Sequence, residues 1–179
     1  MKQYYKTTVA SPVGSITLAG EGENLVGLWM EGQKYFGGMV PGEMIDCDRL
    51  PVFAAAKDWL DRYFAGKKPL ISELSLAPMG GAFRQSVWKI LTEIPYGEVM
   101  TYGEIAKKIA EQNNTASMSA QAVGGAVGHN PISIIIPCHR VVGTNGNLTG
   151  YAGGIPLKIQ LLQHEGVDME RFWYGNKKD

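Results

Sequence analysis

The chain has 179 residues, with 17 Lys and Arg against 17 Asp and Glu, 45% hydrophobic residues and two cysteines. This composition excludes a disordered chain, a collagen and a coiled coil, and it predicts a globular protein of one domain or two small ones. The balanced charge excludes a protein that binds nucleic acid mainly through a large basic surface, so any such contact has to be local. No stretch approaches the roughly 18 apolar residues of a membrane span, and we interpret the protein as intracellular.

The first part of the chain predicts a small sheet followed by a helix. Residues 6–30 read as strands, and within them residues 15–18 and 25–29 predict the two arms of an antiparallel hairpin. Apolar residues then recur at helical spacing from Pro51, and the helix is predicted to stop near Gly66. The following stretch contains Pro and Gly and fits neither the alternation of a strand nor the spacing of a helix. We place the domain boundary there.

The second part predicts several short helices. An apolar stripe over residues 83–94 indicates a buried amphipathic helix, and Thr101 with Glu104 has the spacing of a capping box that opens a second helix. A third helix, roughly residues 117–127, consists almost wholly of small residues. Two short helices joined by a polar turn predict a helix-turn-helix. Its small residues permit two interpretations, close packing against a neighbouring helix or close approach of the backbone to a nucleic-acid groove.

A Cys-His pair follows the most apolar stretch of the chain. Residues 132–136 predict a buried strand, and Cys138, His139 and Arg140 come directly after it. A neighbouring His and Arg can favour the thiolate, the nucleophilic form of cysteine. If the strand continued, the Cys and His side chains would point to opposite faces, so proton removal would need a water molecule or a local helical turn. The histidine also needs a third group to hold its tautomer, and Glu165, at the predicted end of the last helix, is a candidate.

The cysteines do not predict a metal site or a disulfide framework. Neither Cys47 nor Cys138 lies in a C-x-x-C pair, and the three histidines do not supply the missing ligands. We therefore expect neither a metal nor a cofactor, and we interpret Cys47 as a spectator thiol.

Several blocks of the sequence, in matching order and spacing, resemble the O6-alkylguanine-DNA alkyltransferases, also called methylated-DNA--protein-cysteine methyltransferases. The resemblance is strong over residues 83–166 and weaker over residues 7–30. The matching blocks are residues 101–106, 122–126, 130–131, 136–143, 150–154 and 161–166.

This resemblance implies an α+β fold with two domains. Residues 1–80 would form a small ribonuclease-H-like α/β domain with an antiparallel sheet. Residues 81–179 would form a helical domain with a winged-helix-like helix-turn-helix, which carries both DNA binding and alkyl transfer. The implied partner is double-stranded DNA carrying O6-alkylguanine, and the implied protein is a cytoplasmic monomer that does not bind membranes.

The implied activity is DNA repair in a single irreversible turnover. Cys138 would attack the alkyl carbon on O6 of a flipped-out guanine and keep the alkyl group as a thioether, with O4-alkylthymine as an open second substrate. His139 with Glu165 would generate the thiolate through a bound water molecule. Tyr102, with Lys158 near it, would protonate the leaving guanine.

The other implied roles concern the base pocket and the DNA. The second helix of the helix-turn-helix would be the recognition helix, which contacts the DNA. Asn130 would brace the turn between this helix and the active-site strand. The recognition helix would enter the minor groove, where its small residues let the backbone come close. The base pocket would be lined by Val141, Tyr151 and Ala152, and the DNA would be contacted by Ser119, Ala120, Gln121, Ala122 and Gly124.

The chain departs from the family pattern at three places. Gln121 stands where the family usually has an Arg that fills the space left by the flipped base, and Ala152 replaces a Ser often found after the pocket Tyr. Extra polar chain over residues 111–118 lengthens the turn of the helix-turn-helix. These departures concern DNA affinity and substrate range more than the reaction.

Two functions of other classes stay open from the residues. The first is a non-catalytic sensor of alkylated bases, although relatives of that kind lack the cysteine that this chain has. The second is a cysteine hydrolase using Cys138 and His139, for which adjacent spacing gives no direct general-base geometry. An alkyl label that stays on the protein separates the transferase from both.

Overall fold

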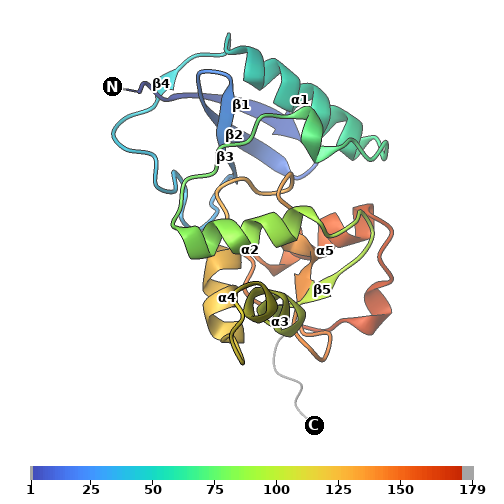
Figure 1. Ribbon diagram of the computed structural model, residues 1–179. Helices are drawn as coiled ribbons and strands as arrows, with labels where there is room; N and C mark the ends of the chain where they lie inside the picture. Colours follow the sequence, from blue (N-terminus) through green and yellow to red (C-terminus); the bar gives the residue numbers. More distant parts are fainter. Residues whose placement is uncertain (1, 175–179) are drawn as a thin grey trace. The chain divides into compact units, whose positions relative to one another are not determined.

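The computed structural model describes residues 2–174 (Figure 1). Its chain divides into two compact units. The first holds the chain up to Gly80 together with Pro131–Ile135, and the second holds Gly81–Asn130 and the chain from Ile136 onward. No helix in the described part is long and apolar enough to cross a membrane.

The first unit is built on a four-stranded sheet with the order β3-β2-β1-β4. Strands β1 (Tyr5–Ser11), β2 (Gly14–Glu21) and β3 (Asn24–Met30) pair antiparallel, which confirms the predicted hairpin. Strand β4 (Ile45–Asp46) adds a short parallel pair on the free edge of β1. Ile16 and Leu18 of β2 are fully buried, whereas β3 is buried at every residue from Leu25 to Met30, so both faces of β3 are covered.

Helix α1 (Pro51–Phe64) packs against the first three strands and confirms the predicted helix. Pro51 occupies the first turn, where its missing N–H costs nothing. The indole Nε1 of Trp59 donates to the carbonyl of Leu70 at 2.9 Å, which ties the chain after the helix to its buried face. A single 3-10 turn, η1 (Ile71–Glu73), follows.

The apolar segment predicted as a buried strand is a series of turns, so that prediction is wrong. Its one ladder contact is a bridge from Ile132 to Leu28 of β3, where the Leu28 N–H donates to the Pro131 carbonyl. Ile134 has a φ of 69°, a conformation that β-branched residues rarely adopt. The isoleucines are there because the segment is buried, and burial rather than extended backbone decided its composition. The same segment, assigned to the second domain by its sequence position, belongs to the first unit.

The second unit begins with three helices, α2 (Ala82–Thr92), α3 (Tyr102–Gln112) and α4 (Ala120–Gly128), as predicted, with α4 packed on the other two. The expected capping box is present: the Thr101 hydroxyl accepts from the Glu104 N–H, and the Glu104 carboxylate accepts from the Thr101 N–H, both at 3.1 Å. Helix α4 begins about three residues later than the sequence indicated.

The rest of the second unit supports the Cys-His segment. Strand β5 (Met100–Thr101) pairs in parallel with β6 (Val141–Val142), directly after the Cys-His-Arg sequence. Helix α5 (Ile155–His164) contacts that sequence, and a 3-10 turn, η3 (Met169–Arg171), packs on α5. Around them is a small core cluster of Val142, Leu148, Leu162 and Val167.

Candidate active site

Cys138 lies in a short 3-10 helix, η2 (Cys138–Arg140), and not in a continuing strand. The Cys138 N–H donates to the Ile136 carbonyl at 2.8 Å, and the Arg140 N–H donates to the Pro137 carbonyl at 3.0 Å. The backbone at Cys138 therefore forms a local helical turn in place of a continuing strand. Both Cys138 and His139 are buried in it.

His139 contacts Glu165, the residue at the C-cap of α5 that the sequence indicated as its partner. The His139 Nε2 and Glu165 Oε2 atoms are 2.6 Å apart, and both side chains are completely buried. Because an ionised carboxylate only accepts, Nε2 donates the hydrogen and Nδ1 is left as the basic atom. Burial lowers the pKa of His139 against the opposing effect of Glu165, which favours the neutral imidazole.

Glu165 is held by three further donors. The Nε and second guanidinium nitrogen of Arg140 lie 2.7 and 3.1 Å from its two oxygens, and the Gly97 N–H donates to Oε1 at 3.1 Å. Burial alone would raise the pKa of this carboxyl, but its hydrogen bonds and charge interactions with His139 and Arg140 outweigh burial and hold the pKa well below the usual range. Sequence reasoning treated Arg140 only as a neighbouring charge and missed this contact, for which the chain carries no local signal.

Tyr102 and Lys158 come from the start of α3 and the middle of α5. Burial and the nearby Cys138 raise the pKa of Tyr102 to about 12, so its hydroxyl keeps its proton at neutral pH. Lys158 is fully buried and donates to the main-chain carbonyl of Val141. Burial lowers the pKa of Lys158 to about 8, within reach of neutral pH.

Asn130 is buried just after α4, where the family resemblance implies a brace. Its side-chain amide donates to the Ile136 carbonyl at 2.8 Å. This hydrogen bond joins the two residues that flank the turn segment Pro131–Ile135, so the chain just after α4 is linked across five residues to the chain that enters the Cys138 turn.

A cavity of about 440 Å³ opens between the start of α3, helix α4 and the loop that follows β6. Gly150, whose φ is 72°, lies on its wall, and a Cβ there would come within 3.0 Å of the Tyr102 hydroxyl. The volume is in the range of small-molecule sites. Its walls include Tyr102, Ala120, Gln121, Gly124, Thr144 and Thr149.

The residues predicted to line the base pocket have a different environment. Val141, Tyr151 and Ala152 are not on the wall of this cavity. Val141 and Tyr151 are buried and Ala152 is half-buried. The pKa of Tyr151 is raised well above its usual value by burial and by the electrostatic influence of the nearby Cys138 and Glu165. Thr144 and Thr149 are wall residues that sequence reasoning did not select, although they flank the Gly150–Gly154 block of the resemblance.

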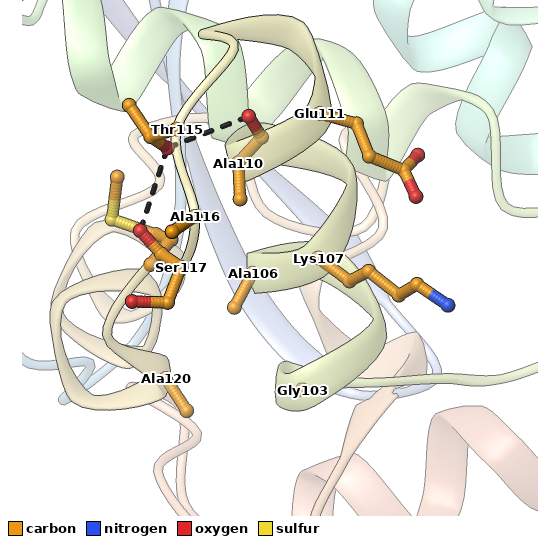
Figure 2. Close-up of a pocket in the computed structure, with 10 residues that line it drawn as sticks. Gly103, Ala106, Lys107, Ala110, Glu111, Thr115, Ala116, Ser117 and Ala120 are labelled. Atoms are coloured by element: carbon orange, nitrogen blue, oxygen red, sulfur yellow. Dashed lines mark hydrogen bonds between the residues drawn. The ribbon is translucent and has the colours of Figure 1, made fainter.

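The lengthened turn between α3 and α4 folds back onto α3 and encloses a second hollow of about 410 Å³ (Figure 2). The Thr115 N–H donates to the Ala110 carbonyl at 2.9 Å, and its hydroxyl is 3.4 Å from the Ser117 carbonyl. Figure 2 shows the Lys107 and Glu111 side chains extending from α3 away from this turn. The extra chain is thus shaped by its own hydrogen bonds.

The outer face of α4 carries small side chains and Gln121. Ser119 caps the helix, with its hydroxyl accepting from the Ala122 N–H at 3.2 Å. A Cβ added to Gly125 would meet nothing within 4 Å, and one added to Gly124 would make only ordinary contact with the Tyr102 ring at 3.8 Å. Packing therefore does not require either glycine, and the close-packing interpretation fails at these two positions. The exposed predicted DNA contacts are Ser119, Ala120, Gln121 and Ala122, while Gly124 is half-buried.

Metal ligands do not gather in the described part of the chain. Within residues 2–174, no group of three or more His, Cys, Asp or Glu side chains is placed to hold a metal ion.

Comparison with known proteins matches both parts of the chain. The DNA binding domain of 6-O-methylguanine DNA methyltransferase matches residues 82–167, and its ribonuclease-like domain matches residues 4–78. A methylated-DNA--protein-cysteine methyltransferase from Haemophilus influenzae is 43% identical over 168 residues, which are 93% of this chain and 89% of the relative. One from Methanosarcina acetivorans is 45% identical over 163 residues, covering 90% of this chain and 98% of the relative.

Solved structures agree with the sequence relatives. The crystal structure of Mycobacterium tuberculosis OGT in complex with DNA has a TM-score of 0.75 and 43% identity, and it covers 95% of this chain and 94% of that one. An O6-methylguanine DNA methyltransferase from Methanococcus jannaschii has a TM-score of 0.63 and 29% identity, covering 97% and 98%. With both domains matched and relatives above 40% identity along nearly the whole length, this chain belongs to the 6-O-methylguanine DNA methyltransferase family.

Proposed function

We propose that the protein repairs alkylated DNA by moving the alkyl group from O6 of guanine to Sγ of Cys138, in one irreversible turnover. The observation that carries this proposal is a buried cysteine beside a buried His139–Glu165 pair, in the same unit as a helix-turn-helix. Its relatives are named methylated-DNA--protein-cysteine methyltransferases, and the M. tuberculosis protein was crystallised with DNA.

The first step is removal of the thiol proton. Nδ1 of His139 is the basic atom of the ring because Nε2 faces Glu165 at 2.6 Å. The proton of Cys138 passes to Nδ1, through a water molecule, and the resulting imidazolium is stabilised by the carboxylate. Displacement at an alkyl carbon requires the thiolate that this transfer produces.

The second step is the displacement itself. The Sγ–carbon bond forms while the carbon–O6 bond breaks, and its electron pair stays with guanine, which has to gain a proton as it leaves. Tyr102 supplies that proton, since its pKa of about 12 keeps the hydroxyl protonated until the guanine becomes basic. Lys158, with a pKa of about 8, offers positive charge beside the tyrosinate that results.

DNA recognition is proposed for the outer face of α4. Its small residues allow the backbone to approach the minor groove, and the target base is flipped out of the duplex at a cost of a few kcal/mol. Gln121 fills the gap left by that base. Val141, Tyr151 and Ala152 stay our proposed lining of the base pocket, although they are not on the wall of the cavity beside Tyr102. O4-alkylthymine remains a second substrate to test.

We further propose that the protein works as a monomer in the cytoplasm, with DNA binding and alkyl transfer both carried by the second unit. The reaction needs a reduced thiol at Cys138, and neither Cys47 nor Cys138 forms a disulfide in the described part of the chain. A reducing compartment keeps thiols in that state.

The test is incubation of the protein with a duplex that carries one O6-methylguanine, followed by peptide mass spectrometry. We expect a methyl group on the peptide containing Cys138, with product limited to one equivalent of protein. Cys138→Ala should abolish transfer and leave DNA binding largely intact, while Cys47→Ala, in the first unit, should retain transfer. Tight binding without a modified cysteine would make the protein a lesion sensor, and turnover beyond one equivalent would make it a hydrolase.

A further inference from the structure

Arg140 is a buried cation whose three nitrogens each have a separate acceptor. Nε lies 2.7 Å from Glu165 Oε1, one terminal nitrogen lies 3.1 Å from Oε2, and the other donates to the Ile94 carbonyl at 2.6 Å. Only 6% of its surface is exposed. This is a bidentate guanidinium–carboxylate pair with a third anchor on the chain that follows α2.

The turn after α2 makes two further contacts with this pair. The Gly97 N–H donates to Glu165 Oε1, and the Tyr96 ring lies 5.7 Å from the guanidinium carbon. Gly97 has a φ of 80°, and a Cβ there would stand 3.1 Å from the Glu165 carbonyl oxygen. Oε1 therefore accepts hydrogen bonds from Gly97 and Arg140, and Oε2 accepts hydrogen bonds from Arg140 and His139.

We infer that Arg140 is a positioning residue for alkyl transfer, which orients the Glu165 carboxylate and offsets its charge so that His139 remains a neutral base until the thiol proton arrives. An uncompensated carboxylate 2.6 Å from the ring would favour a permanent imidazolium, which has no basic nitrogen left. The guanidinium on the same carboxylate opposes that protonation. The inference rests on the proposed function, because it assigns a role within the same reaction.

The charged and titratable groups around the pair belong to several elements. His139 is faced by Glu165, Arg140 and Lys158, and their charges act on its protonation in opposite senses. Tyr96 and Tyr151 face Glu165 and keep their protons at neutral pH because burial raises the pKa of each. Cys138, the residue before His139, is also titratable. Arg140 contacts both carboxylate oxygens.

A lysine at this position would keep the charge but not the geometry. A single ammonium cannot contact both carboxylate oxygens and the Ile94 carbonyl with the spacing of the planar fork. The two functions of the side chain, charge compensation and orientation, can therefore be separated by comparing Arg140→Lys with Arg140→Met.

The experiment combines two measurements on the full chain. The protonation of His139 is followed by nitrogen-15 NMR of its ring against pH, and methyl transfer from an O6-methylguanine duplex is timed over the same pH range. In Arg140→Met we expect the His139 midpoint, and with it the acidic limb of the rate profile, to move upward by about one pH unit. In Arg140→Lys we expect the midpoint to stay and the rate to fall about tenfold. Arg171→Met, an exposed arginine of the same unit, is the matched control and should change neither.

A purely structural role would lower the rate equally at every pH and leave the His139 midpoint unchanged in the folded Arg140→Met variant, which would overturn the inference. If Arg140→Met does not fold, the transfer rate of Arg140→Lys tests the inference. Its loss of rate should disappear in a Glu165→Gln background, and a full rate in Arg140→Lys would overturn the inference. Failure of the proposed function is distinguishable, because the unsubstituted protein would then leave Cys138 unmodified.

Discussion

Tyr102 and Lys158 donate hydrogen bonds to the same acceptor, the main-chain carbonyl of Thr149, at 3.0 and 3.1 Å. One oxygen of the loop after β6 thus aligns a side chain from α3 with a side chain from α5. The shared acceptor keeps the ammonium close to the hydroxyl, where its positive charge would stabilise the tyrosinate left by the proposed proton transfer.

Replacing Tyr102 with Phe tests this arrangement. The change removes the proton donor and keeps the ring beside Gly124. We expect methyl transfer to slow by about a hundredfold, the lower end of what a general acid contributes. Binding of a methylated duplex, measured in a Cys138→Ala background, should be unchanged. Tyr174→Phe, at an exposed tyrosine, is the control. An undiminished rate in Tyr102→Phe would exclude the role of this hydroxyl as the acid.

Lys158→Met should change how stability depends on pH. Burial lowers the pKa of Lys158 from 10.5 to about 8, so between these values the unfolded chain binds more protons than the folded one. The free energy of unfolding contributed by this group therefore rises with pH, and the burial penalty is full below pH 8 and absent above about 10.5.

The measurement is urea unfolding of both proteins between pH 8 and 10. The free energy of unfolding of the unsubstituted protein should rise relative to that of Lys158→Met by up to about 1.4 kcal/mol per pH unit. Tyr102 does not disturb this window, because its folded pKa is raised, and the stability it contributes is present below pH 10 and lost only as the pH rises toward 12. The free energy of unfolding of Lys89→Met, a change at an exposed lysine, should depend on pH as that of the unsubstituted protein does. A constant difference across the window would mean that Lys158 is not a buried cation.

Gly125→Ala should separate folding from DNA binding. Glycine inside a helix is less favourable than alanine by about 1 kcal/mol, and the added Cβ meets nothing within 4 Å. We expect a more stable protein that binds duplex DNA more weakly, measured by urea unfolding and by fluorescence anisotropy. Unchanged affinity in the stabilised variant would show that the backbone of α4 does not approach the groove at this point.

Gln121→Arg should tighten duplex binding by about threefold to tenfold, because an arginine in the minor groove adds a favourable charge. The dependence of binding on salt should steepen by about one released counterion. Gln121→Met has similar length without the charge and should not reproduce either effect. If Gln121→Arg binds no better than the unsubstituted protein, another residue fills the space of the flipped base.

Local patterns predicted much of this fold. The helix that begins at Pro51 and the capping box of Thr101 with Glu104 are set by neighbours within one or two turns, so sequence spacing reveals them. The meeting of His139 and Glu165 was indicated by the need for a third group and by position along a helix, and their 2.6 Å contact confirms it.

The remainder depended on contacts distant in sequence. Arg140 reaches Glu165 across 25 residues and Ile94 across 46, and nothing near Arg140 in the chain signals either partner. The turns after Asn130 were read as a strand because isoleucines favour strands. Their burial against β3, more than a hundred residues earlier, was the actual cause of that composition.

The turn segment Pro131–Ile135 has a consequence for dividing the protein into parts. A fragment that begins at Gly81 would include all three helices of the DNA-binding region and the nucleophile. It would lack β3, against which Ile132 bridges and to whose Leu28 the Ser133 N–H donates. The buried isoleucines would then be uncovered three to six residues before Cys138. Residues 131–135 therefore depend on strand β3 for their burial, and a fragment that begins at Gly81 separates this segment from the strand that covers it.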